Sequence, residues 1–348
     1  MLQVKKMKIA IIGKYFTDSF ANHIDETLQD MGHTTVKIDP EIKFLQSEFL
    51  SQQIRSFTKT LYQQVFYKIP FIRNKNSKKI YNYYRTNKID FTIVVHDFLT
   101  KQEIDEIKKI SSSPIVLWFP DAISNFQKSM FFVAGYDYLF FVDKYIVEKL
   151  NEEFHLNTHY LPQCFNPKKH EKVALTDETD LNKYSCEITN AGNLYPSRAA
   201  LYKHLTKYNF KMWGAPPAVW LSVPELDKII MNKTVFNIEK SKAFNGAKVV
   251  LNNLHPAVIN GVNKRTFEIC GVGGFQITSY RNAVVELFEI GKEIVTYSNL
   301  EELIQKLDYY LAHDDEREQI REAGYQRALK EHTYEHRLNS MLSTVFSK

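Results

Sequence analysis

The chain has 348 residues, more than one hydrophobic core normally serves, so two domains are expected. Its 44% hydrophobic and 24% charged residues are typical of a globular protein, and no apolar run approaches the length of a membrane span. A net charge of +5 favours anionic ligands but is too weakly basic to predict nucleic-acid binding.

Short apolar runs alternate with amphipathic segments in the first half of the chain. Strands are expected at residues 8–13, 34–38, 91–98, 114–120 and 137–143. Apolar residues at helical spacing predict a helix after residue 20, and a capping box from Thr100 to Glu103 starts another. This alternation predicts an α/β fold with a parallel, doubly wound sheet.

The same alternation restarts in the second half. Strands are expected at residues 186–192, 209–215, 247–253, 273–279 and 292–297, and the chain is helical from about 299. The polar segment 161–183 is the expected linker. We therefore predict two Rossmann-like domains, 1–165 and 166–332. A C-terminal helix of about 333–348 is a candidate to pack back on the first domain.

Several chemistries are excluded by missing motifs. Neither Gly13 nor Gly192, which end the first strand of each half, begins a G-x-G-x-x-G fingerprint, and there is no P-loop. His332 and His336 are four residues apart without a metal-binding motif, so we expect two neutral surface residues, no metal and no cofactor. Three scattered cysteines indicate reduced thiols, and with no signal-peptide pattern at the start we expect a cytoplasmic protein.

The segment 260–278 combines four glycines with a charged helix start. Asn263 is placed to cap a helix whose first turn carries Lys264 and Arg265. The helix dipole disfavours cations there, and a bound anion would remove the conflict. Glu268, about one turn further on, can accept hydrogen bonds from ribose hydroxyls. The same charges also fit an ion pair on a solvated helix, and the pattern alone leaves both open.

The pattern from Asn263 to Glu268, followed by the glycines and by segments 291–311 and 321–338, resembles the C-terminal half of CgeB-like glycosyltransferases. The resemblance covers the chain from residue 187 onward, and the first half matches only in outline. It implies the GT-B fold, in which two Rossmann-like domains face a cleft. It also implies transfer of a hexosyl or N-acetylhexosaminyl group from a nucleotide sugar, in the first place a UDP-sugar, without a metal.

The resemblance assigns roles to individual residues. Glu268 matches the glutamate that holds the nucleotide ribose, and Arg198 matches a basic residue that faces the donor diphosphate. Gly192 and Asn193 match the loop before that arginine. Asn260 stands where related retaining enzymes carry a second glutamate, so the resemblance does not extend to the retaining assignment.

The remaining candidates complete a transfer site. Gly13, His255, Asn263, Lys264 and Arg265 are the further candidate donor contacts. The base that activates the acceptor is expected at the carboxyl end of a strand in the first domain, at Asp121 or His96. Histidine and aspartate at strand ends, like His255 after its strand, also serve as turn or cap residues.

The segment 49–89 contains no acidic residue and interleaves cations with aromatics. It is a candidate surface for a glycan, lipid-linked or protein acceptor, or for a peripheral contact with the inner face of a membrane. The alternative is a pair of solvated helices whose aromatics face the core. No nucleic-acid partner is expected.

Two other functions remain compatible with the sequence. A nucleotide-sugar epimerase or hydrolase would use the same donor site without an acceptor, and a non-catalytic protein would bind the nucleotide sugar only. The sugar, the acceptor, the stereochemical outcome and the oligomeric state are not fixed by the sequence.

Overall fold

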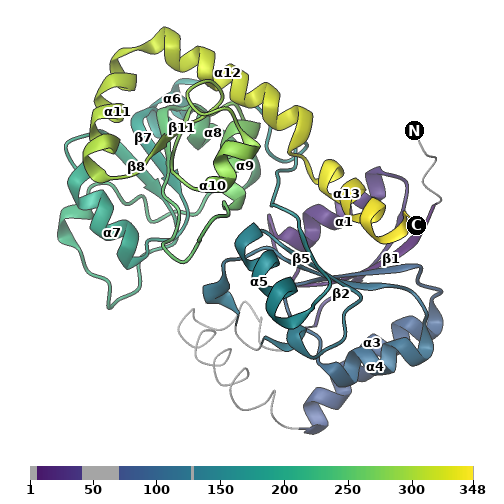
Figure 1. Ribbon diagram of the computed structural model, residues 1–348. Coiled ribbons are helices and arrows are strands. Elements are labelled where there is room, and N and C mark those ends of the chain that lie inside the picture. Colours follow the sequence, from purple (N-terminus) through teal and green to yellow (C-terminus); the bar gives the residue numbers. More distant parts are fainter. Residues whose placement is uncertain (1–5, 41–69, 127–128, 348) are drawn as a thin grey trace. The chain divides into compact units, whose positions relative to one another are not determined.

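Figure 1 shows a computed structural model of the chain, which describes residues 6–40, 70–126 and 129–347. The chain divides into two compact units. The first unit comprises Met1–Pro120, Phe126–Phe140 and Leu150–His159, and the second comprises Asp121–Asn125, Phe141–Lys149 and Tyr160–Lys348. Each unit is described below by itself.

The first sheet has six strands in the order β2-β1-β3-β4-β5-β6, and β1 pairs in parallel with β2 and β3. The strands are β1 (Lys8–Ile12), β2 (Thr34–Ile38), β3 (Phe91–Val95), β4 (Ile115–Phe119), β5 (Tyr138–Phe141) and β6 (Thr158–Tyr160). The helices are α1 (Phe20–Asp30), α3 (Pro70–Thr86), α4 (Lys101–Ile110) and α5 (Lys144–Phe154), with short 3-10 turns η3 (Ile123–Asn125) and η4 (Met130–Phe132). Every residue of β3 and β4 is buried, as their continuous apolar runs predicted.

The second sheet has five strands in the order β11-β10-β9-β7-β8, and all neighbouring strands are parallel. The strands are β7 (Cys186–Ala191), β8 (Phe210–Trp213), β9 (Ala247–Asn252), β10 (Gln276–Ser279) and β11 (Val295–Tyr297). The helices are α6 (Glu178–Tyr184), α7 (Pro196–Tyr202), α8 (Asn237–Asn245), α9 (Lys264–Gly271), α10 (Asn282–Leu287), α11 (Leu300–Ala312), α12 (Asp314–Glu331) and α13 (Tyr334–Phe346), with 3-10 turns η5 (Lys203–Leu205) and η6 (Pro224–Leu226). The predicted restart of the strand–helix pattern is confirmed.

Local signals set the helix starts as the sequence predicted. The hydroxyl of Thr100 accepts from the backbone N–H of Glu103 at 3.4 Å, and the Glu103 carboxylate accepts from the backbone of Thr100 at 2.9 Å, so the capping box is present. The helical tail divides into α11, α12 and α13. Helix α6 begins inside the segment 161–183 that we predicted as a linker.

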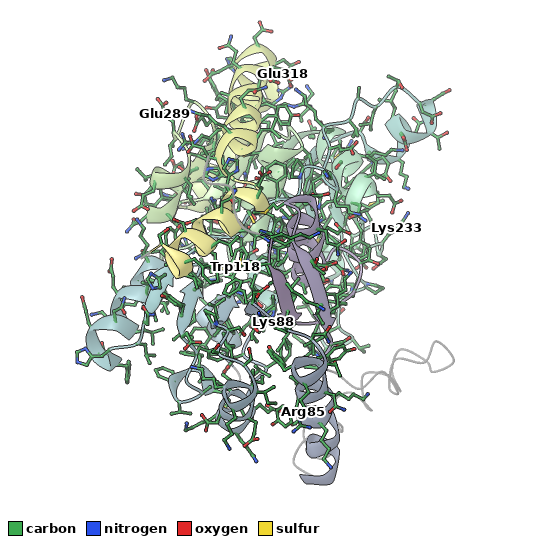
Figure 2. All side chains as sticks on the ribbon, turned by 90° about the vertical axis from the view of Figure 1, so that its right-hand side faces the viewer. Arg85, Lys88, Trp118, Lys233, Glu289 and Glu318 are labelled. Carbon is green, nitrogen blue, oxygen red and sulfur yellow. The ribbon has the colours of Figure 1, made fainter. Side chains whose placement is uncertain are left out.

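The basic segment 49–89 lies partly outside the described residues, which include only 70–89 of it. Helix α3 buries Ile80 and Tyr84, and the Tyr84 hydroxyl lies 2.7 Å from that of Thr92. It exposes Tyr83 and Arg85, and Lys88, just after the helix, is also exposed (Figure 2 labels Arg85 and Lys88). Tyr84 therefore faces the core and Tyr83 the surface. Across the described ranges, no helix combines the length and apolar character needed to cross a membrane.

His332 corrects one expectation. It is buried, with 3% of its surface exposed, where we predicted a surface residue, while His336 is exposed as predicted. Its Nε2 lies 2.8 Å from the carbonyl oxygen of Leu287, and its Nδ1 lies 2.9 Å from Nη2 of Arg337. Arg337 also donates to the carbonyl of Pro162 at 3.1 Å. This network joins α13 to the chain before β7. Hydrophobic periodicity in the sequence could not have predicted it.

The pKa of His332 is lowered to about 3, first by burial and then by the positive charge of Arg337. The pKa of an unfolded histidine is about 6.5, so below that pH the unfolded state binds a proton that the native state does not bind. Stability should therefore fall as the pH drops below about 6.5, by up to about 1.4 kcal/mol per pH unit from this group. The test is urea unfolding of wild type and His332→Gln at several pH values below 6.5. The free energy of unfolding of the glutamine variant should fall less as the pH drops. An equal fall in both proteins would contradict the prediction.

Candidate functional site

The second sheet contains a topological switch point at β7. Strand β7 lies between β8 and β9, so the chain runs outward in opposite directions from it. Ligands of open α/β sheets bind at the carboxyl ends of the strands at such a point. Gly192 follows β7 directly, and its N–H donates to the carbonyl of Trp213 at 2.7 Å. Its φ of +141° is one that residues with side chains rarely adopt.

Two arginines converge on Gly192. A Cβ built on this glycine would lie 2.9 Å from Nη1 of Arg198 and 2.6 Å from Nη1 of Arg265. Arg198 comes from α7 and donates to the carbonyl of Asn193 at 2.6 Å. Arg265 comes from the first turn of α9 and donates to the carbonyl of Ala191 at 2.6 Å. The structure thus brings together four residues that the sequence predicted for the donor site: Gly192, Asn193, Arg198 and Arg265.

The electrostatics of this pair favour an anion. Burial, and then the neighbouring charge of Arg198, lower the pKa of Arg265 to about 9. A guanidinium nevertheless stays protonated in proteins, so the two like charges remain close together. Within the described part of the chain, neither guanidinium forms an ion pair with a carboxylate. An anion beside Gly192 would relieve this repulsion and satisfy both donors.

The start of α9 is held by a buried polar network. The side chain of Asn263 accepts from the N–H of Thr266 at 3.1 Å, which confirms the predicted cap. The Asn252 amide, at the end of β9, donates to the Asn263 side chain at 3.2 Å and to that of Gln276 at 2.9 Å. The network fixes where α9 begins relative to β9 and β10. An asparagine that ends an apolar strand, as Asn252 does, was the signal that could have predicted it.

Glu268 is buried, with 2% of its surface exposed. Its Oε1 lies 2.9 Å from Nζ of Lys264 and 3.1 Å from Nζ of Lys240. Nε2 of His170 lies 3.4 Å from the same oxygen. The expected pairing with Lys264 is present, but it is not the solvated pair of the alternative, because the carboxylate is inside the protein. Lys240 and His170 come from distant elements, and the sequence analysis missed both.

Two further predicted site residues, His255 and Asp121, lie in the second unit, as does Asn260. His255 is exposed, its Nδ1 accepts from the N–H of Ala257 at 3.1 Å, and its ring centroid lies 6.3 Å from that of Tyr195. Asp121 begins the short segment Asp121–Asn125 and is partly exposed. The backbone N–H of Asn260 donates to the Asp143 carboxylate at 2.9 Å.

Gly13 and His96 belong to the first unit. A Cβ at Gly13 would lie 3.0 Å from the Cβ of Ala21 and 3.2 Å from that of Val95, so close packing of β1, α1 and β3 already explains this glycine. His96 follows β3 with a left-handed φ of +65°. Such strain at a residue other than glycine costs of order 1 kcal/mol and is common at functional sites.

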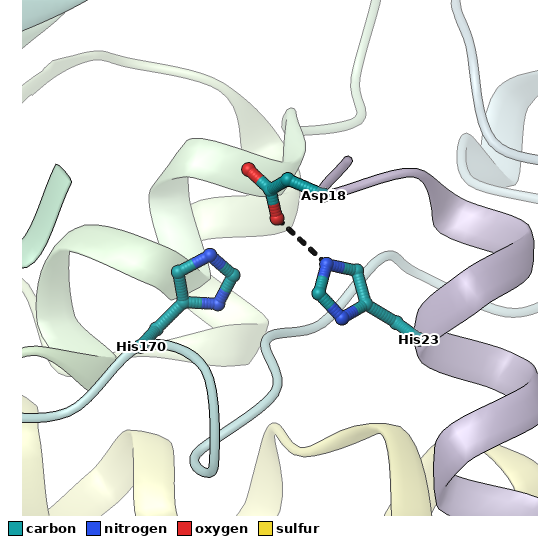
Figure 3. Close-up of side chains that lie close together, drawn as sticks. All are labelled: Asp18, His23 and His170. Carbon is teal, nitrogen blue, oxygen red and sulfur yellow. Dashed lines mark hydrogen bonds and ion pairs between the residues drawn. The ribbon is translucent and has the colours of Figure 1, made fainter. Parts of the chain in front are cut away.

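The first unit also contains an aspartate–histidine pair that the sequence analysis missed (Figure 3). Asp18 lies in the loop between β1 and α1 with a φ of +62°, and its Oδ1 lies 2.7 Å from Nε2 of His23. His170, also drawn in Figure 3, belongs to the second unit. A left-handed loop aspartate that turns back to the following helix has no signature in periodicity.

Residues 197–343 match a family model described as glycosyl transferase-like. Over 270 residues the chain is 22% identical to the spore protein CgeB of Bacillus subtilis strain 168, a stretch that covers 71% of this chain and 80% of that protein. The predicted likeness to CgeB-like glycosyltransferases is confirmed. The matched segment begins inside α7, includes Arg198 and contains the whole of α9, so the two arginines beside Gly192 lie in the part of the chain that resembles glycosyltransferases.

Solved structures share the fold over nearly the whole chain. A glycosyltransferase from Rickettsia africae ESF-5 has a TM-score of 0.68 at 14% identity, with 98% of each chain covered. Sucrose-phosphate synthase from Thermosynechococcus elongatus has a TM-score of 0.67 at 10% identity, covering 98% of this chain and 100% of that one. Anabaena HepE in complex with UDP-glucose has a TM-score of 0.66 at 11% identity, with the same coverage. The predicted α/β GT-B fold is confirmed.

Proposed function

We propose that the protein is a glycosyltransferase that moves a hexosyl or N-acetylhexosaminyl group from a nucleotide sugar, in the first place a UDP-sugar, to an acceptor. The observation that carries the proposal is the convergence of Arg198 and Arg265 on Gly192, where an anion would relieve their repulsion. The glycosyltransferase-like match over 197–343 and the UDP-glucose bound by a protein of the same fold, HepE, support this choice of ligand.

In the proposed reaction, the bond between the sugar's anomeric carbon and the diphosphate oxygen breaks, and its electron pair stays on the diphosphate. The acceptor's nucleophilic atom forms the new bond to that carbon and gives up its proton. Arg198 and Arg265 are placed to stabilise that growing charge, and Lys264, the first residue of α9, is the further candidate cation. Glu268 holds the ribose hydroxyls. Because these cations can supply the stabilisation, we propose that transfer needs no divalent metal.

The acceptor side of the proposal rests on the first half of the chain. We propose that residues 1–165 bind the acceptor, a glycan, a lipid-linked sugar or a protein, and that residues 166–332 bind the donor. Asp121 or His96 would take the acceptor's proton. His96 has a left-handed backbone, a conformation that occurs both at functional sites and in turns. The reaction would take place in the cytoplasm, as a step in making a glycoconjugate.

Binding and product analysis test the proposal in sequence. UDP and UDP-sugars should raise the melting temperature of the protein more than ADP or GDP do, because the site is proposed to prefer uridine nucleotides. A ligand at about 100 times its Kd adds about 2.7 kcal/mol of stability. Incubation with a UDP-sugar and acceptor extracts should then give a glycosylated product. If no nucleotide or nucleotide sugar stabilises the protein, the donor site is wrong. If UDP is released without a glycosylated product, a hydrolase or epimerase replaces the transferase, and binding without turnover identifies a non-catalytic protein.

A further inference from the structure

Lys240 is a buried lysine outside the predicted site. It lies on α8, and only 8% of its surface is exposed. Its neighbours Ala243 and Phe244 are fully buried, so this face of α8 packs inward. Burying an ammonium group costs several kcal/mol unless it meets an opposite charge. The Nζ of Lys240 meets that charge at Oε1 of Glu268, 3.1 Å away.

Glu268 is held from two sides by different helices. Lys264 reaches it along α9, at 2.9 Å, and the Lys264 side chain is 20% exposed. Lys240 reaches it from α8, and its side chain is 10% exposed. Both ammonium groups lie at the same carboxylate oxygen, Oε1. Lys240 is therefore the inner anchor of the carboxylate, and Lys264 is its partner nearer the surface.

The position of Lys240 is not explained by its own helix. It lies about one turn from the start of α8, where the helix dipole does not favour a cation. Lys242, two residues further on, is more exposed and pairs with Asp180 at 2.5 Å. The two lysines of α8 thus have different roles. Lys242 forms an ion pair with Asp180 on α6, and Lys240 contacts the buried carboxylate of Glu268 on α9.

We infer that Lys240 is a positioning residue for donor binding, which orients the Glu268 carboxylate toward the ribose hydroxyls of the nucleotide. The inference rests on the proposed function, because it assigns the ribose to Glu268. An ammonium group at 3.1 Å restricts the carboxylate to one orientation. Without Lys240, Oε1 keeps Lys264 at 2.9 Å and His170 at 3.4 Å but loses the ammonium group that holds it from α8, and the geometry for two adjacent hydroxyls is lost.

The test compares UDP with 2′,3′-dideoxy-UDP, which lacks both ribose hydroxyls. Wild type should bind UDP at least about tenfold more tightly than the dideoxy analogue, since one hydrogen bond to a carboxylate is expected to contribute about tenfold and the analogue loses two. Lys240→Met should abolish that preference, measured by isothermal titration, while Lys242→Met on the same helix should keep it. A loss of general packing would weaken both nucleotides equally and would leave their ratio unchanged, which would overturn the inference.

A double-mutant cycle keeps the test valid if Lys240→Met fails to fold. Lys240→Met combined with Glu268→Gln removes both buried charges, so this double variant should fold. On the Glu268→Gln background, Lys240→Met should cause no further loss of UDP affinity. A further loss there would mean that Lys240 contacts the nucleotide directly, and the inference would be wrong. If wild type binds no nucleotide at all, the proposed function itself fails.

Discussion

Arg265→Met is expected to weaken UDP binding by about 100-fold, because a charge-assisted pair with a phosphate contributes roughly 1.5–3 kcal/mol. The same change should alter the stability of the nucleotide-free protein little, because relief of the repulsion from Arg198 offsets loss of the hydrogen bond to the Ala191 carbonyl. Arg265 is held against Arg198 beside Gly192, and its pKa is lowered to about 9 by burial and by that neighbouring charge. Methionine keeps most of the side-chain volume and removes the repulsion.

A large loss of UDP affinity with little change in stability distinguishes a ligand-binding arginine from a structural one. Isothermal titration gives the UDP affinity, and urea unfolding gives the free energy of unfolding without nucleotide. Arg327→Met is the matched control, because Arg327 lies on α12 and pairs with Glu331 at 3.0 Å; it should leave UDP affinity unchanged. If Arg265→Met destabilises the protein and binds UDP normally, Arg265 serves the fold and the anion site is wrong.

The sequence predicted those parts of the site that depend on local patterns. Asn263 as a helix cap and Arg265 in the first turn follow from residue types a few positions apart, and the structure places both as expected. The parallel direction of the strands also follows from a local rule, since strand–helix alternation leads to parallel sheets. Gly192 and Arg198 needed more than local pattern, namely the resemblance to a family.

The residues that the sequence missed are joined across long stretches of chain. Lys240 and Glu268 are 28 residues apart, and Lys240 looks like any lysine of a surface helix until α8 is seen to turn it inward. His332 was misjudged for the same reason, because burial of a helical residue depends on what packs over it. The left-handed backbones of Asp18 and His96 are equally invisible, since nothing in a single sequence reports φ at a residue other than glycine.

Gly192→Ala is the second change with a large expected effect. The backbone at Gly192 has a φ of +141°, so alanine should cost about 1–3 kcal/mol of stability. Its methyl group would lie 2.6 Å from Nη1 of Arg265 and 2.9 Å from Nη1 of Arg198. Guanidinium groups are the flexible ends of long side chains, so they would move aside, and UDP affinity should fall by roughly 100-fold or more as both lose their positions.

Gly291→Ala separates backbone strain from the loss of the site. Gly291 also has a left-handed φ, +84°, but no atom lies within 4 Å of a Cβ built there. Alanine at Gly291 should therefore cost about 1 kcal/mol of stability through strain alone and leave UDP affinity unchanged. UDP titration of both variants, at a temperature below that at which either unfolds, gives the two affinities to compare. If Gly291→Ala loses as much affinity as Gly192→Ala, general loosening of the unit explains both; if only Gly192→Ala loses it, the anion lies where the two arginines meet the glycine.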